Sequence, residues 1–260
     1  MTSPDLSTRL EPAAYVAHLR TDLAALLAAS RDLAAEVPGC PGWTVRDLLG
    51  HVLGVYRHKL AALRGDVDTD GPGTPADGWG AVGPGEDVAA LLAATGEELA
   101  AELGSRDAGA AAWTWWPPEQ TVGFWQRRMA HETSVHRWDA QSAAHGPDGA
   151  DDVDDALATD GVDELLGWLE WPWDDLPQED ARGHKVLVST GEHSWLVALD
   201  RTAVTVVAVD EVEDADALVA GPPSDLLLHL WDRPISQGVV SHGDETALRL
   251  VRERLRMATS

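Results

Sequence analysis

The chain contains a single cysteine, a single phenylalanine and only two lysines, Lys59 and Lys185. One cysteine excludes a disulfide within the chain. Positive charge is scarce, with 19 basic against 44 acidic residues and a net charge of −25, which argues against nucleic acid or an anionic membrane as a partner. Long apolar runs are also missing, so we expect no membrane span. No signal peptide is recognised in the first residues, and we expect a soluble, cytoplasmic protein.

The first half of the chain has helical periodicity instead. Apolar residues recur at helical spacing over residues 8–36, and residues 44–47 predict an acidic variant of the capping box at the start of a second long helix. Residues 65–85 are rich in Gly, Pro and Asp and predict a long surface loop. Further helices are expected over residues 86–103 and from Thr121 onward. Four such helices favour an antiparallel bundle.

The composition changes near residue 146, where a polar hinge rich in Gly, Pro and Asp is expected. We therefore predict two domains, residues 1–148 and residues 149–260, and we find no internal repeat. The predicted fold class is α+β, with a four-helix bundle followed by a small α+β domain. In the second domain we expect helices over residues 154–170, 226–231 and 245–257, and strands over residues 185–190, 195–199 and 203–209.

Glu132 and His136 lie one helical turn apart in the fourth helix. Four residues advance a helix by about 400°, so both side chains project from one face, where they can bind one divalent metal. His51, on the apolar face of the second helix, is the candidate third ligand, because facing helices of a bundle can supply ligands to one interior metal. Two histidines and one carboxylate leave a coordination position open, as in catalytic zinc sites. From spacing alone, a hydrogen-bonded core histidine and a surface Glu–His pair remain alternatives.

The dipeptide at 131–132 resembles the beginning of the HExxH protease motif, but the spacing rejects this motif. His131 and His136 are five residues apart and point about 140° away from each other on a helix. We expect His131 to be a core residue or to support the site from behind. Asp139, three residues after His136, either reaches the second ring nitrogen of that histidine or pairs with Arg137 or faces solvent.

Other residues have both a functional and a structural interpretation. Cys40 has no histidine near it in sequence, and we expect it in a structural turn rather than as a nucleophile. Arg127 and Arg128 could meet an anionic substrate, although such residues on a helix are more often solvated or paired. The tryptophans of segment 113–116 could line a cleft, although large aromatic side chains more often pack.

Three stretches resemble the mycothiol-dependent maleylpyruvate isomerase family, whose first domain is a DinB-like metal-binding four-helix bundle. These are residues 37–48 leading to His51, residues 124–132 and residues 135–140. The second half of the chain resembles the smaller C-terminal domain of that family. The resemblance implies Zn²⁺, or another divalent metal, bound by His51, Glu132 and His136.

The resemblance also implies mycothiol as a cosubstrate. Zinc at an open site favours the thiolate, which is the nucleophilic form of a thiol. The thiolate would add to an electrophilic small molecule for cis–trans isomerisation or for S-transfer, and the metal ligands do not distinguish the two reactions. An Fe(II)-dependent thiol oxygenase is a second hypothesis, and a non-catalytic metal-binding or interaction module is a third. Monomer and homodimer both stay open.

Overall fold

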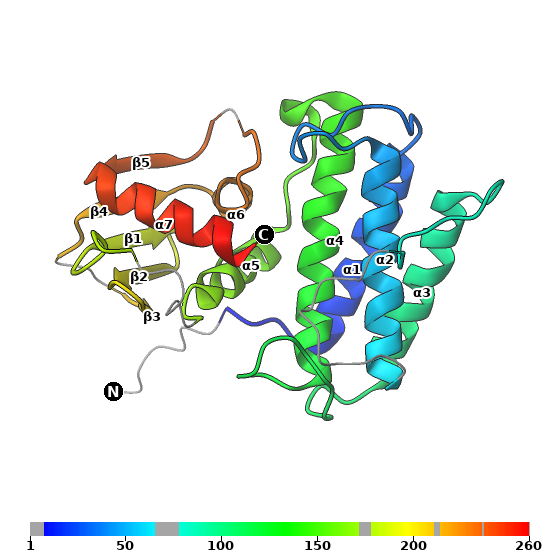
Figure 1. Ribbon diagram of the computed structural model, residues 1–260, viewed down its shortest axis with the longest axis horizontal. Helices are drawn as coiled ribbons and strands as arrows, with labels where there is room; N and C mark the ends of the chain where they lie inside the picture. Colours follow the sequence, from blue (N-terminus) through cyan, green and yellow to red (C-terminus); the bar gives the residue numbers. More distant parts are fainter. Residues whose placement is uncertain (1–7, 66–77, 172–177, 211–213, 236, 260) are drawn as a thin grey trace. The chain divides into compact units, whose positions relative to one another are not determined.

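The computed structural model describes residues 8–65, 78–171, 178–210, 214–235 and 237–259. The chain forms two compact units, one comprising Leu10–Asp151 and a second comprising Asp152 onward together with the described residues before Leu10. The first unit is all helical, and the second combines helices with a five-stranded sheet (Figure 1). This arrangement confirms the predicted α+β fold class. The predicted domain boundary at residue 148 stays a prediction.

The first unit contains four long helices that run side by side (Figure 1). Helix α1 packs along α4, α2 packs along α3, and α2 also contacts α4. The first helix ends earlier than predicted. The hydroxyl of Ser30 donates to the carbonyl of Leu26, and a carboxylate oxygen of Asp32 accepts from the amide of Ala34; such local bonds compete with helix continuation. The helices are α1 (Pro12–Ala29), α2 (Val45–Arg64), α3 (Val88–Ser105) and α4 (Val122–His145).

A capping box fixes the start of α2, as predicted. The side chain of Thr44 accepts from the backbone amide of Asp47, and the Asp47 carboxylate accepts from the backbone amide of Thr44 at 2.8 Å. Before it, the amide of Val37 donates to the carbonyl of Trp43 and closes a tight turn that contains Cys40. The chain therefore enters α2 in a defined direction, with His51 about two turns along the helix.

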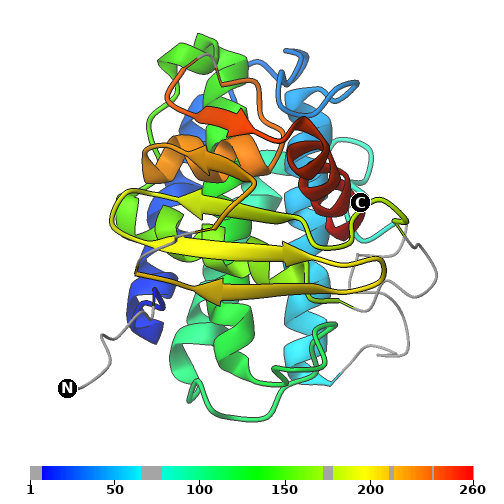
Figure 2. The ribbon, with the colours of Figure 1, turned by 90° about the vertical axis from the view of Figure 1, so that its left-hand side faces the viewer.

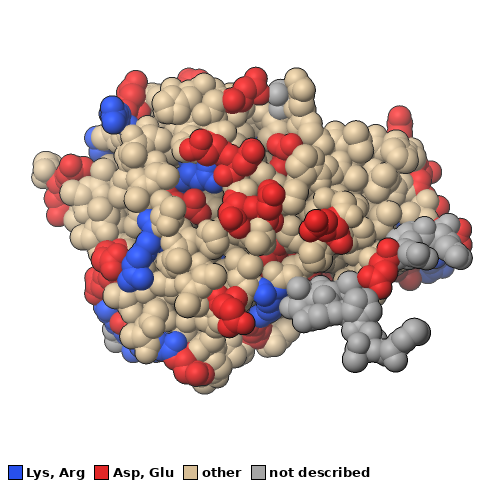
Figure 3. Space-filling model, turned by 180° about the vertical axis from the view of Figure 1, so that it is seen from behind, with Lys and Arg blue, Asp and Glu red and all other residues tan. Residues whose placement is uncertain are grey.

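The loop expected over residues 65–85 lies largely outside the described residues, which resume at Gly78. The end of this segment is attached to α2, because the guanidinium of Arg57 donates to the carbonyls of Trp79 at 3.1 Å and Ala81 at 2.9 Å. Among the described helices, none combines the length and hydropathy that a bilayer span requires. Figure 3 shows acidic side chains scattered over one face of the molecule, with fewer basic ones between them.

The second unit is built on a mixed sheet with the strand order β3-β2-β1-β4-β5, visible in Figure 2. The three predicted strands form consecutive antiparallel pairs, and β4 then pairs parallel to β1. Strands β4 and β5 were not predicted. The elements are η1 (Pro147–Gly149), which belongs to the first unit, and then α5 (Asp155–Trp168), β1 (Lys185–Ser189), β2 (Ser194–Leu199), β3 (Val204–Ala208), β4 (Ala217–Ala220), α6 (Pro223–Leu230), β5 (Val240–Gly243) and α7 (Glu245–Ala258).

Candidate metal centre

The three predicted ligands come together between α2 and α4. One ligand atom each from His51, Glu132 and His136 lie within 4.8 Å of one another. The Oε1 atom of Glu132 is 3.2 Å from Nε2 of His51 and 3.3 Å from Nε2 of His136. Two imidazole nitrogens and one carboxylate oxygen in this arrangement are the donor set that zinc takes in proteins, so the residues present fit a divalent metal.

The three side chains differ in their exposure to solvent. Those of Glu132 and His136 are only 14% and 10% exposed, whereas that of His51 is 34% exposed. The pair on α4 is thus embedded in the bundle, and the α2 side of the site faces solvent.

The charges of the two buried residues are strongly coupled. Burial alone would raise the pKa of Glu132, but hydrogen bonds with His136 and His51 and the charge of Arg128 hold that pKa well below its usual value. Burial alone would lower the pKa of His136, but hydrogen bonds with Asp139 and Glu132 raise it to about 9. The carboxylate is therefore ionised at neutral pH, and a metal must displace a proton from His136 below about pH 9.

Asp139 supports the His136 ring from behind. Its fully buried carboxylate accepts from Nδ1 of His136 at 2.9 Å, which leaves Nε2 directed toward Glu132. The sequence left three alternatives open for Asp139, and the structure shows the contact with the second ring nitrogen of His136. Arg137 pairs instead with Asp22 at 3.2 Å and with Gln141 at 2.7 Å. Carboxylates in this position fix the tautomer and orientation of a metal-binding histidine.

We expect Asp139→Asn to weaken zinc binding by about 10- to 100-fold, because the amide no longer fixes the tautomer of His136 or raises the basicity of its ring. Competition against a chromophoric chelator measures this change. Asp22→Asn is the matched control, since it makes the same substitution beside α4 and removes the partner of Arg137 rather than that of His136. Equal zinc affinity in Asp139→Asn and the wild type would contradict the assigned role of this carboxylate.

Cys40 lies in a turn, as expected, but the turn brings it close to the site. Its Sγ atom is 3.6 Å from Oδ2 of Asp139, and Cys40, His136 and Asp139 form a second group of potential metal ligands within 4.8 Å. Both groups need His136. Because Asp139 occupies its Nδ1 atom, the ring presents Nε2 to Glu132 and His51. The geometry therefore favours the predicted triad as the metal site, with Cys40 bound to the supporting carboxylate.

Buried basic side chains lie along α2 and α4 near the site, and Arg128 contacts the other oxygen of Glu132. Arg128 donates to Oε2 of Glu132 at 2.5 Å, so its side chain is paired rather than solvated. Arg127 is also buried. Lys59, which the sequence analysis did not single out, is 3% exposed, and burial lowers its pKa to about 7. Its Nζ atom is 3.0 Å from Nδ1 of His58 and 4.7 Å from the ring centre of Trp125.

The tryptophans of segment 113–116 pack rather than line the metal centre. Trp115 contacts Phe124 with ring centres 5.4 Å apart, and the carbonyl of Trp113 accepts from Nε1 of Trp125 at 2.7 Å. Both contacts lie at the beginning of α4, about two helical turns before Glu132. The cluster therefore closes one end of the bundle core.

Trp43, for which no role was predicted, is the aromatic neighbour of the site. Its ring centre is 5.0 Å from that of His51. The sequence offered one sign of this contact, since Trp43 stands directly before the capping residue Thr44. A residue in the turn before a helix can fold back toward the first turns of that helix. His131, as expected, points elsewhere and is buried against Tyr15 of α1 with ring centres 6.1 Å apart.

Comparisons with known proteins place this geometry in context. Residues 16–141 match a family model described as the mycothiol maleylpyruvate isomerase N-terminal domain. The crystal structure of the mycothiol-dependent maleylpyruvate isomerase is similar with a TM-score of 0.53 and 15% identity, covering 90% of this chain and 95% of that chain. A histidine-to-alanine mutant of that enzyme gives a TM-score of 0.55 at 13% identity with the same coverage. No curated protein matches the sequence. The structural likeness confirms the predicted fold, a DinB-like bundle with a smaller second domain.

Proposed function

We propose that this chain, whose residues 16–141 match the N-terminal domain model of the mycothiol maleylpyruvate isomerase family, is a metal-dependent enzyme of that family that activates a low-molecular-weight thiol. The observation that carries the proposal is the convergence of His51, Glu132 and His136 at a site with one solvent-facing side. We propose zinc as the metal and mycothiol as the cosubstrate. When bound there, zinc would favour the thiolate over the neutral thiol.

The residues around the centre support this chemistry. Glu132 is ionised and balances part of the metal charge, while Asp139 holds His136 in the orientation that presents Nε2. Trp43 covers one side of His51 with an apolar ring. His51 is the most exposed of the three side chains. A thiol and its electrophile would therefore enter from the His51 side. The bundle thus offers a fixed, partly desolvated place for a nucleophilic sulfur.

The reaction we propose is thiol addition to a conjugated double bond. A bond forms between sulfur and carbon, and the π electrons move toward the conjugated carbonyl. Rotation about the resulting single bond and expulsion of the same sulfur give the isomer and return the thiol. In S-transfer the sulfur stays attached and a leaving group departs or a proton is added. Isomerisation is the first choice because the similar solved structures carry that name.

The experiment that tests this proposal is a turnover assay with product analysis. Zinc-loaded protein is mixed with maleylpyruvate and mycothiol, and then with glutathione or cysteine in place of mycothiol. We expect thiol-dependent formation of the trans isomer with mycothiol recovered unchanged. A stable thioether product would instead identify an S-transferase.

Two outcomes would contradict the proposed chemistry. Oxygen consumption with a thiol and Fe(II), absent with Zn²⁺, would identify an oxygenase. A metal-loaded protein without turnover on any thiol and electrophile pair would identify a non-catalytic module.

A further inference from the structure

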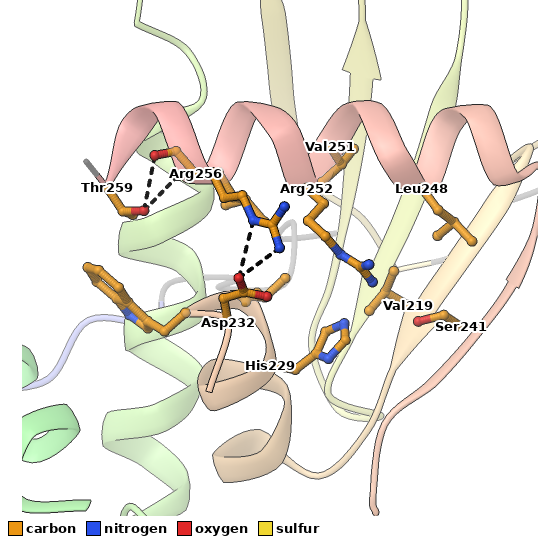
Figure 4. A pocket seen from close by; sticks show the side chains of 12 residues that line it. Val219, His229, Asp232, Ser241, Leu248, Val251, Arg252, Arg256 and Thr259 are labelled. Atoms are coloured by element: carbon orange, nitrogen blue, oxygen red, sulfur yellow. Dashed lines mark hydrogen bonds and ion pairs between the residues drawn. The ribbon is translucent and has the colours of Figure 1, made fainter. Parts of the chain in front are cut away.

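A small pocket lies within the second unit, where α7 crosses α6 and the strands β4 and β5 (Figure 4). Its cavity volume is about 40 Å³. One wall is apolar and consists of Val219, Leu248 and Val251. The polar residues of the lining are His229 on α6, Ser241 on β5, Arg252 and Arg256 on α7, and Asp232 and Thr259 just after α6 and α7. The carboxylate of Asp232 is paired with Arg256, so the donors left for a ligand are those of His229, Ser241 and Arg252, from three elements distant in sequence.

Arg252 points its guanidinium into the pocket, toward His229 (Figure 4). Within the described part of the chain, this guanidinium makes no hydrogen bond or ion pair. Its neighbours on α7 are paired: Arg256 is 2.8 Å from Asp232, and Arg249 is 2.6 Å from Asp180. The Arg252 side chain is exposed and keeps its positive charge available to a ligand at the pocket.

His229 and Ser241 complete the polar side. Burial, and then the charge of Arg252, lower the pKa of His229, so the ring is neutral near pH 7 and has one N–H to donate. No hydrogen bond joins this ring to any other residue in the described ranges. The Ser241 hydroxyl lies beside Val219, on the strand side of the pocket (Figure 4). A negatively charged group in the pocket would satisfy these donors together.

We infer that this pocket binds the carboxylate of a small aliphatic acid, held by Arg252 with His229 and Ser241 as further donors. The planar fork of arginine matches the two oxygens of a carboxylate. One water needs about 10–15 Å³ of such volume, so the cavity has room for a group of about three heavy atoms, the size of a carboxylate. The aliphatic body would lie beyond this volume, in the open part of the pocket beside the apolar wall, which suits it better than a fully hydrated inorganic anion. The inference concerns a second ligand site, because every residue of the lining belongs to the second unit.

Titration of the full-length protein with butyrate, followed by ¹H–¹⁵N NMR, tests the inference. We expect saturable shifts confined to amides of α6, β5 and α7, and no saturable shifts with the neutral analogue butyramide. Arg252→Gln should weaken butyrate binding by at least about tenfold, since it removes a charge-assisted bidentate bond. Arg249→Gln is the matched control, because it makes the same charge change one helical turn away, outside the pocket, and it should keep wild-type affinity.

Three results would overturn the inference. These are wild-type affinity for butyrate in Arg252→Gln, equal weakening in Arg249→Gln, and binding of inorganic phosphate as tight as that of butyrate at matched ionic strength. Arg252→Lys keeps the charge and lacks the fork, so it should bind butyrate with intermediate affinity. If Arg252→Gln does not fold, Arg252→Lys decides the matter, and undiminished affinity in that variant rejects the bidentate arrangement. The metal centre plays no part in these measurements, so they stand or fall apart from the thiol chemistry.

Discussion

Glu132→Gln is expected to reduce the zinc content of the purified protein from about one ion per chain to less than about a tenth of an ion. The Oε1 atom of Glu132 is within 3.2 Å of His51 and 3.3 Å of His136, so it is the atom that both imidazoles share. Glutamine keeps the size of the side chain and removes its negative charge. A divalent cation in a site with only two neutral nitrogen donors is weakly held. Elemental analysis after dialysis against trace zinc measures the content.

The remaining ligands and one control variant complete this series. His51→Ala and His136→Ala should lose zinc in the same way, and thiol-dependent turnover should disappear with it. Glu97→Gln on α3 makes the same chemical change at an exposed Glu that pairs with Arg20, and it should retain about one zinc per chain. If wild-type protein purifies without zinc and binds none on titration, or if Glu132→Gln retains a full equivalent, the proposed centre is wrong.

Lys59→Met is expected to raise the free energy of unfolding by about 4 kcal/mol at pH 6. Burial, opposed in part by the attraction of Glu132, lowers the pKa of this amine from 10.5 to about 7, and each pKa unit corresponds to about 1.4 kcal/mol. Methionine fills a similar volume without a charge to desolvate. The loss of the contact with Nδ1 of His58 offsets about 1 kcal/mol of the gain.

The sign of the pH dependence follows from proton counting. Between about pH 7 and pH 10.5 the unfolded chain holds a proton on Lys59 that the folded protein lacks, so wild-type stability rises with pH across this window. The advantage of Lys59→Met should therefore be largest below pH 7 and should shrink toward pH 10. Urea unfolding at several pH values gives both quantities.

The chain supplies its own control for this experiment. Lys185, the only other lysine, begins β1 and is exposed, so Lys185→Met should change stability little at any pH. A gain in Lys59→Met that does not vary between pH 6 and pH 10 would show that the amine is not buried in its charged form.

Only part of the candidate metal centre could be predicted from local geometry. Glu132 and His136 share a face by helical spacing alone, whereas His51 lies 81 residues before Glu132 and was expected as the third ligand from its place on α2 and from the family resemblance. The contact between Cys40 and Asp139 spans 99 residues, and no spacing rule connects them. Lys59 was overlooked because an isolated lysine in a helix normally extends its amine to water; the apolar residues around it were the only sign of burial.

Only three of the five strands of the sheet in the second unit were predicted from the sequence. Strands β1 to β3 contain β-branched residues in runs long enough to be recognised. Strand β4 is four residues long, and all four residues of β5 are exposed, so neither contains an alternating apolar pattern. These two strands exist because they pair with β1 and with each other, and such pairing depends on tertiary structure rather than on local preference.

The contact between His51 and Glu132 joins residues 81 positions apart. An ion held by both residues would act as a reversible staple between α2 and α4, and its binding energy would add to the energy that keeps the chain folded. At a free ion concentration one hundred times the dissociation constant, this amounts to about 2.7 kcal/mol. Scarcity of the ion would then shorten the lifetime of the whole bundle against proteases, so the abundance of the protein would follow the supply of metal in its surroundings.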